Sequence, residues 1–502
     1  MTTFITGDTK YVFAVYSPTQ TPNSSCHGRS LRPPIAAKDD RWPLVLHLMQ
    51  RTHSVSMPPR RLILLGLDWI RKKDPPVALA TASIAAACAS VADVSTLTVN
   101  VNQPAIDLRR EMSSFLSEAT ANDKQPPLIA IGGYIWAEHL LNDAVSHIKH
   151  DLGTEAHVLL GGPQVTYAPA GTDGAFLSSA YPLVDGFVRG HGEEPMRQLL
   201  MGKTAPTGYS CRTQFDLGVQ AKGGFVTSPS PFLTGWMPAQ RFLRWETQRG
   251  CPFSCSFCQH KDSQDRRTPL DRGRIFDECE WMVDQSLNGP LRDLAIVDPT
   301  FNSGPNYLEV LSRLSGFTGK ISLQCRLEMM SDDFVHKVLD LSRTADVVLE
   351  FGVQTIHRKE QRLIDRPNNM RRIERWIDQL NSEGVPYELS FMYGLPEQTL
   401  DSFQRTLEWA ERKCSEHRDG KAIARFFPLM LLRGTRLHDR SHELGLVTCD
   451  SLQVDISGRV GSNIPHVVAS RTFTFEDWLV MNKEGERVNR MELHLNARSD
   501  MI

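Results

Sequence analysis

Three cysteines in one short segment constrain this chain more than any other feature. Cys251, Cys255 and Cys258 are spaced C-x3-C-x2-C in the run Arg-Gly-Cys-Pro-Phe-Ser-Cys-Ser-Phe-Cys. Cysteine thiolates are the usual ligands of 4Fe-4S clusters, and three on one tight loop can hold three of the irons. The remaining iron is then open to a small molecule that could take an electron from the cluster. The spacing therefore predicts a cluster-binding loop with one open iron.

A zinc site and a chance grouping of thiols fit these cysteines less well than a cluster does. A structural zinc site needs four closed ligands and typically uses C-x2-C pairs; only His260, two residues past Cys258, could add a ligand here. Unrelated buried thiols are the second alternative. The remaining cysteines are scattered and suggest no disulfide framework, which favours a reducing compartment; they are Cys26, Cys88, Cys211, Cys279, Cys325, Cys414 and Cys449.

The charge balance argues against nucleic-acid and membrane partners. The chain of 502 residues has 56 Lys and Arg against 58 Asp and Glu, with no polybasic run. Its longest apolar stretch, residues 77–92, is Ala-rich and broken by Ser and Thr, so we expect a packed helix there rather than a membrane span. The first residues lack the blocks of a signal peptide. We expect a cytoplasmic protein.

Strand-like and helix-like segments alternate twice along the chain. After an irregular segment at 1–57, a first alternation covers 58–200, with strands predicted at 61–67, 95–101, 127–133, 157–163 and 184–190. This pattern predicts an α/β domain with a doubly wound, Rossmann-like parallel sheet. Such sheets bind ligands at the carboxyl ends of their strands. A linker at 201–238 follows.

The second alternation, at 239–431, contains the cysteine segment. Its strands are predicted at 241–247, 293–298, 320–326, 346–352, 387–393 and 422–427. Six β/α units predict a partial (β/α)6 TIM barrel with its chemistry at the strand carboxyl ends. Residues 432–502 form a C-terminal segment that we expect to close the barrel mouth.

The cysteine spacing, with an aromatic residue just before the last cysteine, resembles the radical S-adenosylmethionine (SAM) superfamily. The resemblance implies that the amino and carboxylate groups of SAM chelate the open iron. Phe257 would lie near the adenine or simply pack the loop. Arg326, Glu350, Gln354 and Tyr393 follow or end barrel strands, and the resemblance places them near SAM or substrate. Internal salt bridges among such groups are the alternative.

Glycines end the strands of the first alternation, in Gly-Gly-Tyr-Ile-Trp, Gly-Gly-Pro-Gln-Val and Arg-Gly-His-Gly-Glu-Glu. Turn glycines would account for each alone, but together these runs resemble the cobalamin-binding domain of one radical SAM subfamily. The implied cobalamin contacts are Gly132, Gly133, Tyr134, Trp136, Gly161, Gly162, Pro163, Gln164, Val165, Gly190, Gly192 and Glu193.

The chain lacks the D-x-H-x-x-G run by which other cobalamin domains donate a histidine to cobalt. We therefore expect cobalamin in its base-off form, with no histidine ligand. By the same resemblance the loop of Arg71, Lys72 and Lys73 approaches the lower face of the corrin, although ordinary surface charges would account for these residues too.

The resemblance implies a cobalamin-dependent radical SAM methyltransferase. A methyl group would pass from SAM through methylcobalamin to an unactivated carbon, or to phosphorus, of a small-molecule or peptide natural-product precursor, and an electron donor such as flavodoxin or ferredoxin would supply the cluster. We expect a monomer and assign no catalytic residue. Polar methylation of an aromatic ring such as tryptophan, and cyclisation or rearrangement, remain open, as does a non-enzymatic iron-sulfur or corrinoid carrier.

Overall fold

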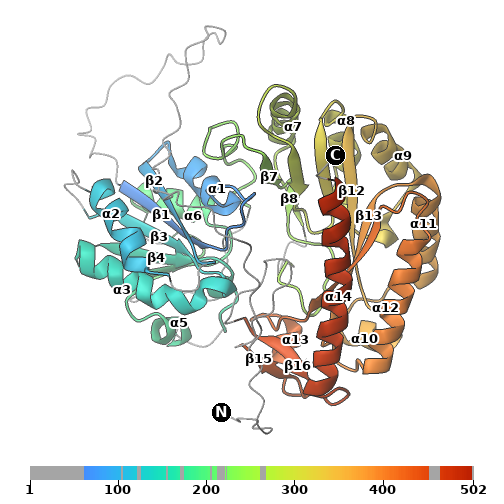
Figure 1. Ribbon diagram of the computed structural model, residues 1–502. Coiled ribbons are helices and arrows are strands. Elements are labelled where there is room, and N and C mark those ends of the chain that lie inside the picture. Colours follow the sequence, from blue (N-terminus) through green and yellow to red (C-terminus); the bar gives the residue numbers. More distant parts are fainter. Residues whose placement is uncertain are drawn as a thin grey trace.

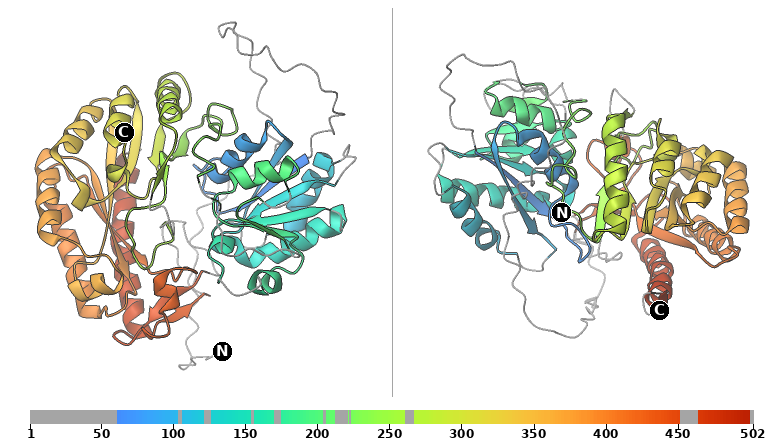
Figure 2. Two further views of the ribbon diagram at one scale, coloured as in Figure 1. Left: turned by 180° about the vertical axis from the view of Figure 1, so that it is seen from behind. Right: turned by 90° about the horizontal axis from the view of Figure 1, so that it is seen from above.

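The computed structural model describes residues 61–102, 106–120, 126–153, 156–169, 175–203, 206–211, 221, 223–260, 267–450 and 464–499. The segment predicted as irregular, 1–57, lies outside these residues. Two α/β domains lie side by side, and each is built on a six-stranded sheet (Figures 1 and 2). The predicted fold class is confirmed.

The N-terminal sheet has the strand order β2-β1-β3-β4-β5-β6 and is parallel except for β6. Its strands are β1 (Arg61–Asp68), β2 (Asp93–Asn100), β3 (Leu128–Gly132), β4 (His157–Gly161), β5 (Gly186–Val188) and β6 (Tyr209–Cys211). The helices are α1 (Leu79–Cys88), α2 (Leu108–Thr120), η1 (Ile135–Leu140), α3 (Leu141–Leu152), α4 (Pro163–Thr166), α5 (Ala175–Ala180) and α6 (Glu193–Leu200).

Helices cover both faces of this sheet, which explains its nearly continuous apolar strands. In β1, Ile63 belongs to the buried cluster beneath α2 and α3, while Leu62 and Leu64 belong to the cluster beneath α1 and α6. The Ala-rich segment forms α1, in which Ala82 and Ala85 are fully buried. None of the described helices combines the length and the apolar character needed to cross a bilayer.

The predicted linker at 201–238 needs correction, because part of it belongs to the folded domains. Strand β6 pairs antiparallel with β5 at the edge of the N-terminal sheet. Phe225, Phe232 and Met237 are buried in the core cluster of the second domain. The many Gly, Ser, Pro and Thr residues of this segment led to its prediction as a linker, although it contains a strand and buried aromatic residues.

The second sheet is an open barrel whose neighbouring strands are all parallel, in the order β14-β13-β12-β11-β10-β7. The strands are β7 (Phe242–Trp245), β10 (Asp293–Ile296), β11 (Gly319–Cys325), β12 (Ala345–Gln354), β13 (Tyr387–Tyr393) and β14 (Ala422–Pro428). The surrounding helices are α7 (Arg272–Leu287), α8 (Tyr307–Arg313), α9 (Asp332–Leu341), α10 (Arg358–Leu363), α11 (Met370–Glu383) and α12 (Leu400–Ser415).

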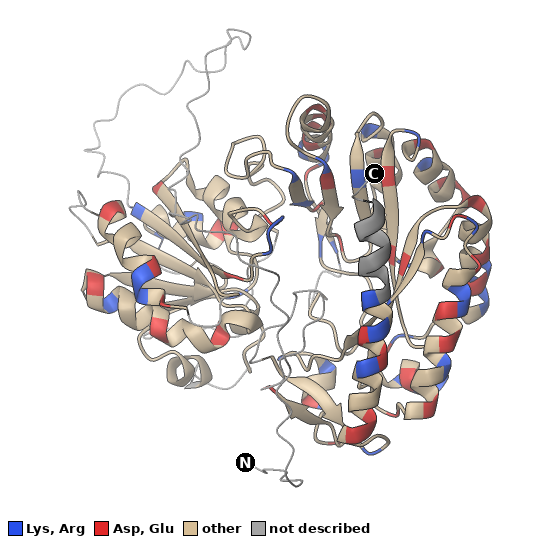
Figure 3. Cartoon of the chain, viewed as in Figure 1, with Lys and Arg blue, Asp and Glu red and all other residues tan. Residues whose placement is uncertain are grey.

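The C-terminal helix α14 (Phe475–Ser499) covers the edge strand β14 (Figure 1). The side-chain amide of Asn489 accepts a hydrogen bond from the Phe426 N–H at 3.0 Å and donates one to the Phe426 carbonyl at 2.9 Å. Covering an edge in this way satisfies backbone groups that would otherwise be open for pairing. Charged residues lie mainly on the outer helices, whereas the sheets carry few (Figure 3).

Ion pairs join the loop after β1 to the first barrel strands. Asp74, whose side chain is almost buried, accepts from Arg71 at 2.8 Å and from Arg244 of β7 at 2.7 Å. Lys73 pairs with Asp293 of β10 at 3.1 Å. The structure therefore uses Arg71 and Lys73, which we expected near the corrin, in contacts at this domain boundary.

Candidate active site

A cavity of about 520 Å³ lies where the carboxyl ends of the N-terminal strands meet the segment around the cysteines. The ends of β1, β3, β4 and β5 supply one wall, and Ile84 and Leu79 of α1 add apolar surface. Residues 246, 248–250, 259 and 260 of the barrel domain supply the opposite wall, immediately beside Cys251 and Cys258. The volume and the largely apolar lining are those of a cofactor site.

The expected cobalamin contacts divide into two groups. The cavity is lined by Gly132, Tyr134, Gly161, Gly162, Pro163, Gly190, Gly192 and Glu193. The others are not among the lining residues, namely Gly133, Trp136, Gln164 and Val165. Trp136 supports the wall from behind, because its ring stacks on Tyr134 at 4.6 Å and its indole N–H donates to the Leu67 carbonyl.

The glycines at the ends of β3 and β4 differ in whether the backbone geometry requires glycine at their position. Gly162 has φ +87°, and a Cβ there would lie 2.9 Å from the Gly133 carbonyl oxygen. The Gly133 N–H donates to the Gly161 carbonyl at 2.8 Å. Gly133 and Gly162 thus allow two backbones to approach closely. Gly161 has no such need, since the nearest atom to its Cβ would be 3.5 Å away.

Acidic groups surround the cavity, and one arginine bridges two of them across the domain boundary. Arg249 pairs with Glu193 of α6 at 2.7 Å and with Glu246 at 2.7 Å. Asp68 ends β1, and burial raises its pKa to about 6, although Arg244 opposes this shift. Within the described part of the chain, Oδ2 of Asp68 has no hydrogen-bond partner. Asp68 therefore presents an unsatisfied polar atom at the cavity wall.

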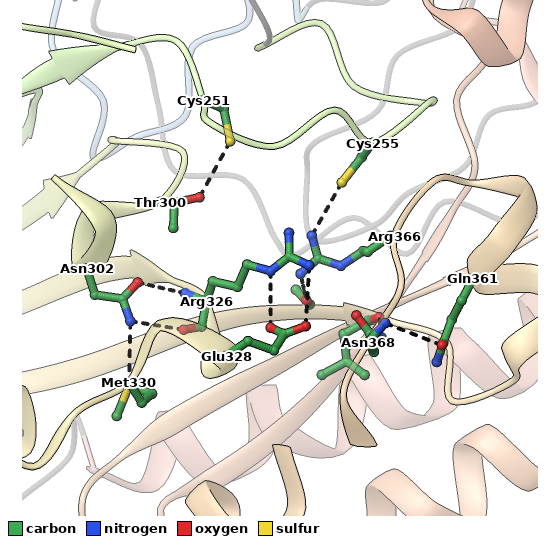
Figure 4. Close-up of polar contacts among 12 residues, drawn as sticks. Cys251, Cys255, Thr300, Asn302, Arg326, Glu328, Met330, Gln361, Arg366 and Asn368 are labelled. Carbon is green, nitrogen blue, oxygen red and sulfur yellow. Dashed lines mark hydrogen bonds and ion pairs between the residues drawn. The ribbon is translucent and has the colours of Figure 1, made fainter. Parts of the chain in front are cut away.

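Each cysteine sulfur contacts one hydrogen-bonding group. Thr300 Oγ1 lies 3.6 Å from Cys251 Sγ, and Arg366 Nη1 donates to Cys255 Sγ at 3.6 Å (Figure 4). The His260 N–H donates to Cys258 Sγ at 3.4 Å. Burial raises the pKa of Cys258 to about 11, so its thiolate needs a cation beside it.

The three thiols are compatible with a cluster, in which each iron takes its own thiolate. Across the residues that the structure describes, no three His, Cys, Asp or Glu side chains converge closely enough to bind one metal ion. A cubane instead takes one thiolate at each of three separate irons. Donors to every sulfur are also typical of iron-sulfur sites.

Asp298, which follows β10, holds the segment that leads into the cysteine loop. Its carboxylate accepts from the Thr247 N–H at 2.7 Å, the Thr247 hydroxyl at 2.5 Å and the Gln248 N–H at 3.3 Å. Burial raises the pKa of Asp298 to about 7, and the donors from Thr247 oppose this rise. Asp298 is the last residue of the strand predicted at 293–298, and the structure gives it this anchoring role.

Four of the five expected SAM contacts lie on or near the barrel interior. Arg326 holds its guanidinium 3.8 Å from the ring of Phe253 in the cysteine loop and pairs with Glu328 at 3.1 Å. Glu350 and Gln354 lie on the face of β12 opposite to its helix-covered residues. Phe257 is partly buried against the barrel core.

Tyr393 differs from this group. Its hydroxyl donates to Asn482 of α14 at 2.8 Å, and its ring packs on Trp478. Because side chains alternate along a strand, Tyr393 lies on the helix side of β13 with Phe391. The expectation for its side chain is corrected to packing, and only its backbone remains at the strand end.

Comparison with known proteins agrees with this arrangement. Residues 245–410 match the Radical SAM superfamily. The chain is similar to the cobalamin-dependent radical SAM methyltransferase TokK of Streptomyces tokunonensis, with 28% identity over 56% of this chain and 44% of that protein. It is also similar to the 2-(S-pantetheinyl)-carbapenam-3-carboxylate methyltransferase of Streptantibioticus cattleyicolor, with 27% identity over 58% and 45%. The matching part is therefore less than half of each relative.

Solved structures extend the likeness of the fold to both domains. TsrM from Kitasatospora setae, a radical SAM methyltransferase bound to tryptophan and a SAM analogue, has a TM-score of 0.61 at 15% identity, covering 86% of this chain and 89% of that one. OxsB, a cobalamin-dependent SAM radical enzyme bound to aqua-cobalamin and SAM, has a TM-score of 0.62 at 14% identity, covering 84% and 66%. Residues 245–410 of this chain thus match the Radical SAM superfamily, and its two domains share the fold of TsrM and OxsB.

Proposed function

We propose that this protein is a cobalamin-dependent radical SAM methyltransferase acting on a small-molecule or peptide acceptor. One observation carries the proposal: a single cavity joins the glycine-ended strands of the N-terminal domain to Gly250, the residue before Cys251. A corrin on those strand ends would face the open corner of a cluster on the loop. That juxtaposition would bring SAM, bound at the cluster, close to the corrin, as transfer of a methyl group from SAM to cobalt needs.

The proposed cofactors are a 4Fe-4S cluster, cobalamin and SAM. When bound, the cluster supplies the electron that cleaves SAM and the corrin carries the methyl group. Cys251, Cys255 and Cys258 would hold the cluster, and the glycine-ended strands would hold the corrin. Arg326, Glu350, Gln354 and Phe257 would surround SAM, whose ammonium, carboxylate and adenine call for such mixed partners. No single residue is proposed as the acid or base.

We propose that cobalamin binds base-off without a histidine on cobalt. Two histidines line the cavity, His191 and His260. The ring of His191 already packs edge-on against Phe225 at 4.5 Å, and the backbone of His260 is held in the cysteine loop, where its N–H donates to Cys258 Sγ. Electron paramagnetic resonance of bound cob(II)alamin tests the point: nitrogen hyperfine splitting that disappears in His191→Ala or His260→Ala would refute it.

The activity test uses the full chain, purified and reconstituted with iron, sulfide and hydroxocobalamin without oxygen. SAM, dithionite and a panel of acceptors are added, beginning with tryptophan and a pantetheinyl carbapenam, the substrate types of its relatives. S-adenosylhomocysteine together with 5′-deoxyadenosine supports radical methylation. S-adenosylhomocysteine alone indicates the polar route, and deoxyadenosine alone indicates rearrangement. Neither product across the panel would favour a carrier.

A matched variant separates cluster chemistry from background hydrolysis. Cys258→Ala removes one iron ligand and should abolish both products, whereas Cys279→Ala, which changes a buried cysteine of α7 outside the cysteine loop, should leave them unchanged. Flavodoxin or ferredoxin should replace dithionite as the electron source. Light scattering should give the mass of a monomer.

A further inference from the structure

Arg366 lies in the loop after α10 and is held against the cysteine loop. Its backbone N–H donates to the Gln361 carbonyl, and its guanidinium donates through Nη2 to the Gly352 carbonyl of β12. Nη1 donates to Cys255 Sγ at 3.6 Å (Figure 4). The two loops are also joined by the Ser256 N–H, which donates to the Ile364 carbonyl at 2.9 Å. The guanidinium is therefore fixed at the sulfur.

The charge of Arg366 is unusual because it is buried without a carboxylate. The residue is 9% exposed, and among the described residues no acidic group lies within ion-pair distance of its guanidinium. By contrast, the nearby Arg326 pairs with Glu328. A buried cation needs a negative partner. Among the described surroundings, the anion that could serve is a thiolate of the cysteine loop.

The other two sulfurs have no charged hydrogen-bond donor among the described residues, although the charge of Arg366 also reaches Cys258. Cys251 has the neutral hydroxyl of Thr300 beside it, and Cys258 has a backbone N–H. Arg366 thus makes the one charge-assisted contact among the three that the structure describes, and such contacts are about twice as strong as neutral ones. Hydrogen bonds to the sulfurs and local charge are two of the properties that set the potential of an iron-sulfur cluster.

We infer that Arg366 raises the reduction potential of the cluster held by the cysteine loop, making its one-electron reduction easier. The inference rests on the proposed function, because it requires a cluster. A cluster on three thiolates is already anionic, and the added electron increases its negative charge. Arg366 stabilises that reduced form more than the oxidised form, through its charge and through a stronger hydrogen bond to Cys255. It is a tuning residue that acts through the cysteine.

The experiment is a redox titration of the reconstituted full chain without SAM, with dithionite as reductant and the signal of the reduced cluster as readout. Arg366→Met removes charge and donor, Arg366→Gln keeps a neutral donor, and Arg366→Lys keeps the charge. At the wild-type midpoint, Arg366→Met should lower the reduced-to-oxidised ratio about tenfold, a shift of about 59 mV for one electron. Arg366→Lys should recover most of the ratio, and Arg366→Gln only a small part.

Thr300→Val is the matched control, because it removes an uncharged group from another cysteine of the same loop; its ratio should fall less than about threefold. A wild-type ratio in Arg366→Met would overturn the inference. So would a change seen only after SAM is added, which would assign Arg366 to the SAM carboxylate. If all Arg366 variants folded but failed to take up iron, the role of Arg366 would be structural, and the inference that it sets the reduction potential would be overturned. Absence of iron and sulfide from the wild type would instead refute the proposed function itself, and this inference with it.

Discussion

Replacement of Asp298 should loosen the start of the cysteine loop while leaving the barrel folded. In Asp298→Ala, the N–H and hydroxyl of Thr247 and the N–H of Gln248 lose their acceptor. A hydrogen bond to a charged group contributes about 1.5–3 kcal/mol. The two contacts to Thr247 are short, and the contact to Gln248, at 3.3 Å, is long and counts for little. We expect a local loss of about 3 kcal/mol.

Hydrogen exchange measured by mass spectrometry on the peptide that contains residues 246–250 reads this loss directly. Since 1.4 kcal/mol is a factor of ten, the opening equilibrium of the segment should rise roughly hundredfold in Asp298→Ala. Asp298→Asn should give a smaller rise, about tenfold. Burial already favours the uncharged acid, with a pKa of about 7, and the amide keeps one acceptor oxygen. Iron content after reconstitution should fall in the same order.

The control is Asp293→Asn, at the other end of the same strand. Asp293 pairs with the half-exposed Lys73, and such pairs contribute at most about 1 kcal/mol. Exchange in the 246–250 peptide should then change less than about threefold. If folded Asp298→Ala also stayed within threefold of the wild type, the carboxylate would not be what holds this segment.

Two further predictions concern pH and the glycines. Burial lowers the pKa of His466 from 6.5 to about 4, so its contribution to stability is intact above pH 6.5 and is lost as the pH falls toward 4; at pH 5 the loss is about 2 kcal/mol. His466→Asn should narrow the difference in urea stability between pH 8 and pH 5 by that amount, and an unchanged difference would contradict the assignment. Gly162→Ala should destabilise the N-terminal domain, because its Cβ would meet the Gly133 carbonyl at 2.9 Å. Gly161→Ala should melt like the wild type but bind hydroxocobalamin about tenfold more weakly, since one added carbon in a fitted site costs about 1–3 kcal/mol; equal affinity would show that the corrin does not approach this strand end.

Most strands could be predicted from the sequence, because a strand that is buried in a sheet needs a run of apolar residues of its own. The prediction missed β6, a strand of 3 residues, whose existence depends on pairing with β5 rather than on its own pattern. The prediction for the side chain of Tyr393 was wrong, although the alternation of buried and partly buried residues in β13 indicates which way this side chain faces. Tyr393 shares its phase with Leu389 and Phe391, which are fully buried beneath the helices. The alternation along β13 thus determines that the side chain of Tyr393 faces the helices and not the barrel interior.

The cysteine loop could be predicted from the sequence because its three cysteines are close together in the chain. The residues that surround the cysteines in the fold could not be predicted, because they are far away in the sequence. Arg366 is 111 residues from Cys255, and Thr300 is 49 residues from Cys251. Only the folded barrel brings the ends of its strands and loops together at one mouth. Asp68 could have been predicted as a cavity residue from the sequence, because it ends a buried strand at the ligand-binding edge of the sheet.

The C-terminal segment fixes where the cavity sits relative to the cysteine loop. Gln259, just after Cys258, donates its side-chain amide to the Arg433 carbonyl at 2.8 Å and accepts at its backbone from the Tyr167 hydroxyl of the N-terminal domain. Arg433 in turn pairs with Glu138 of η1 at 2.8 Å. Three separate parts of the chain thus meet at the end of the loop. A corrin on one domain and a cluster with its SAM on the other would keep their spacing only while this junction holds. The two domains expressed separately should therefore bind their cofactors without transferring a methyl group from SAM to cobalamin.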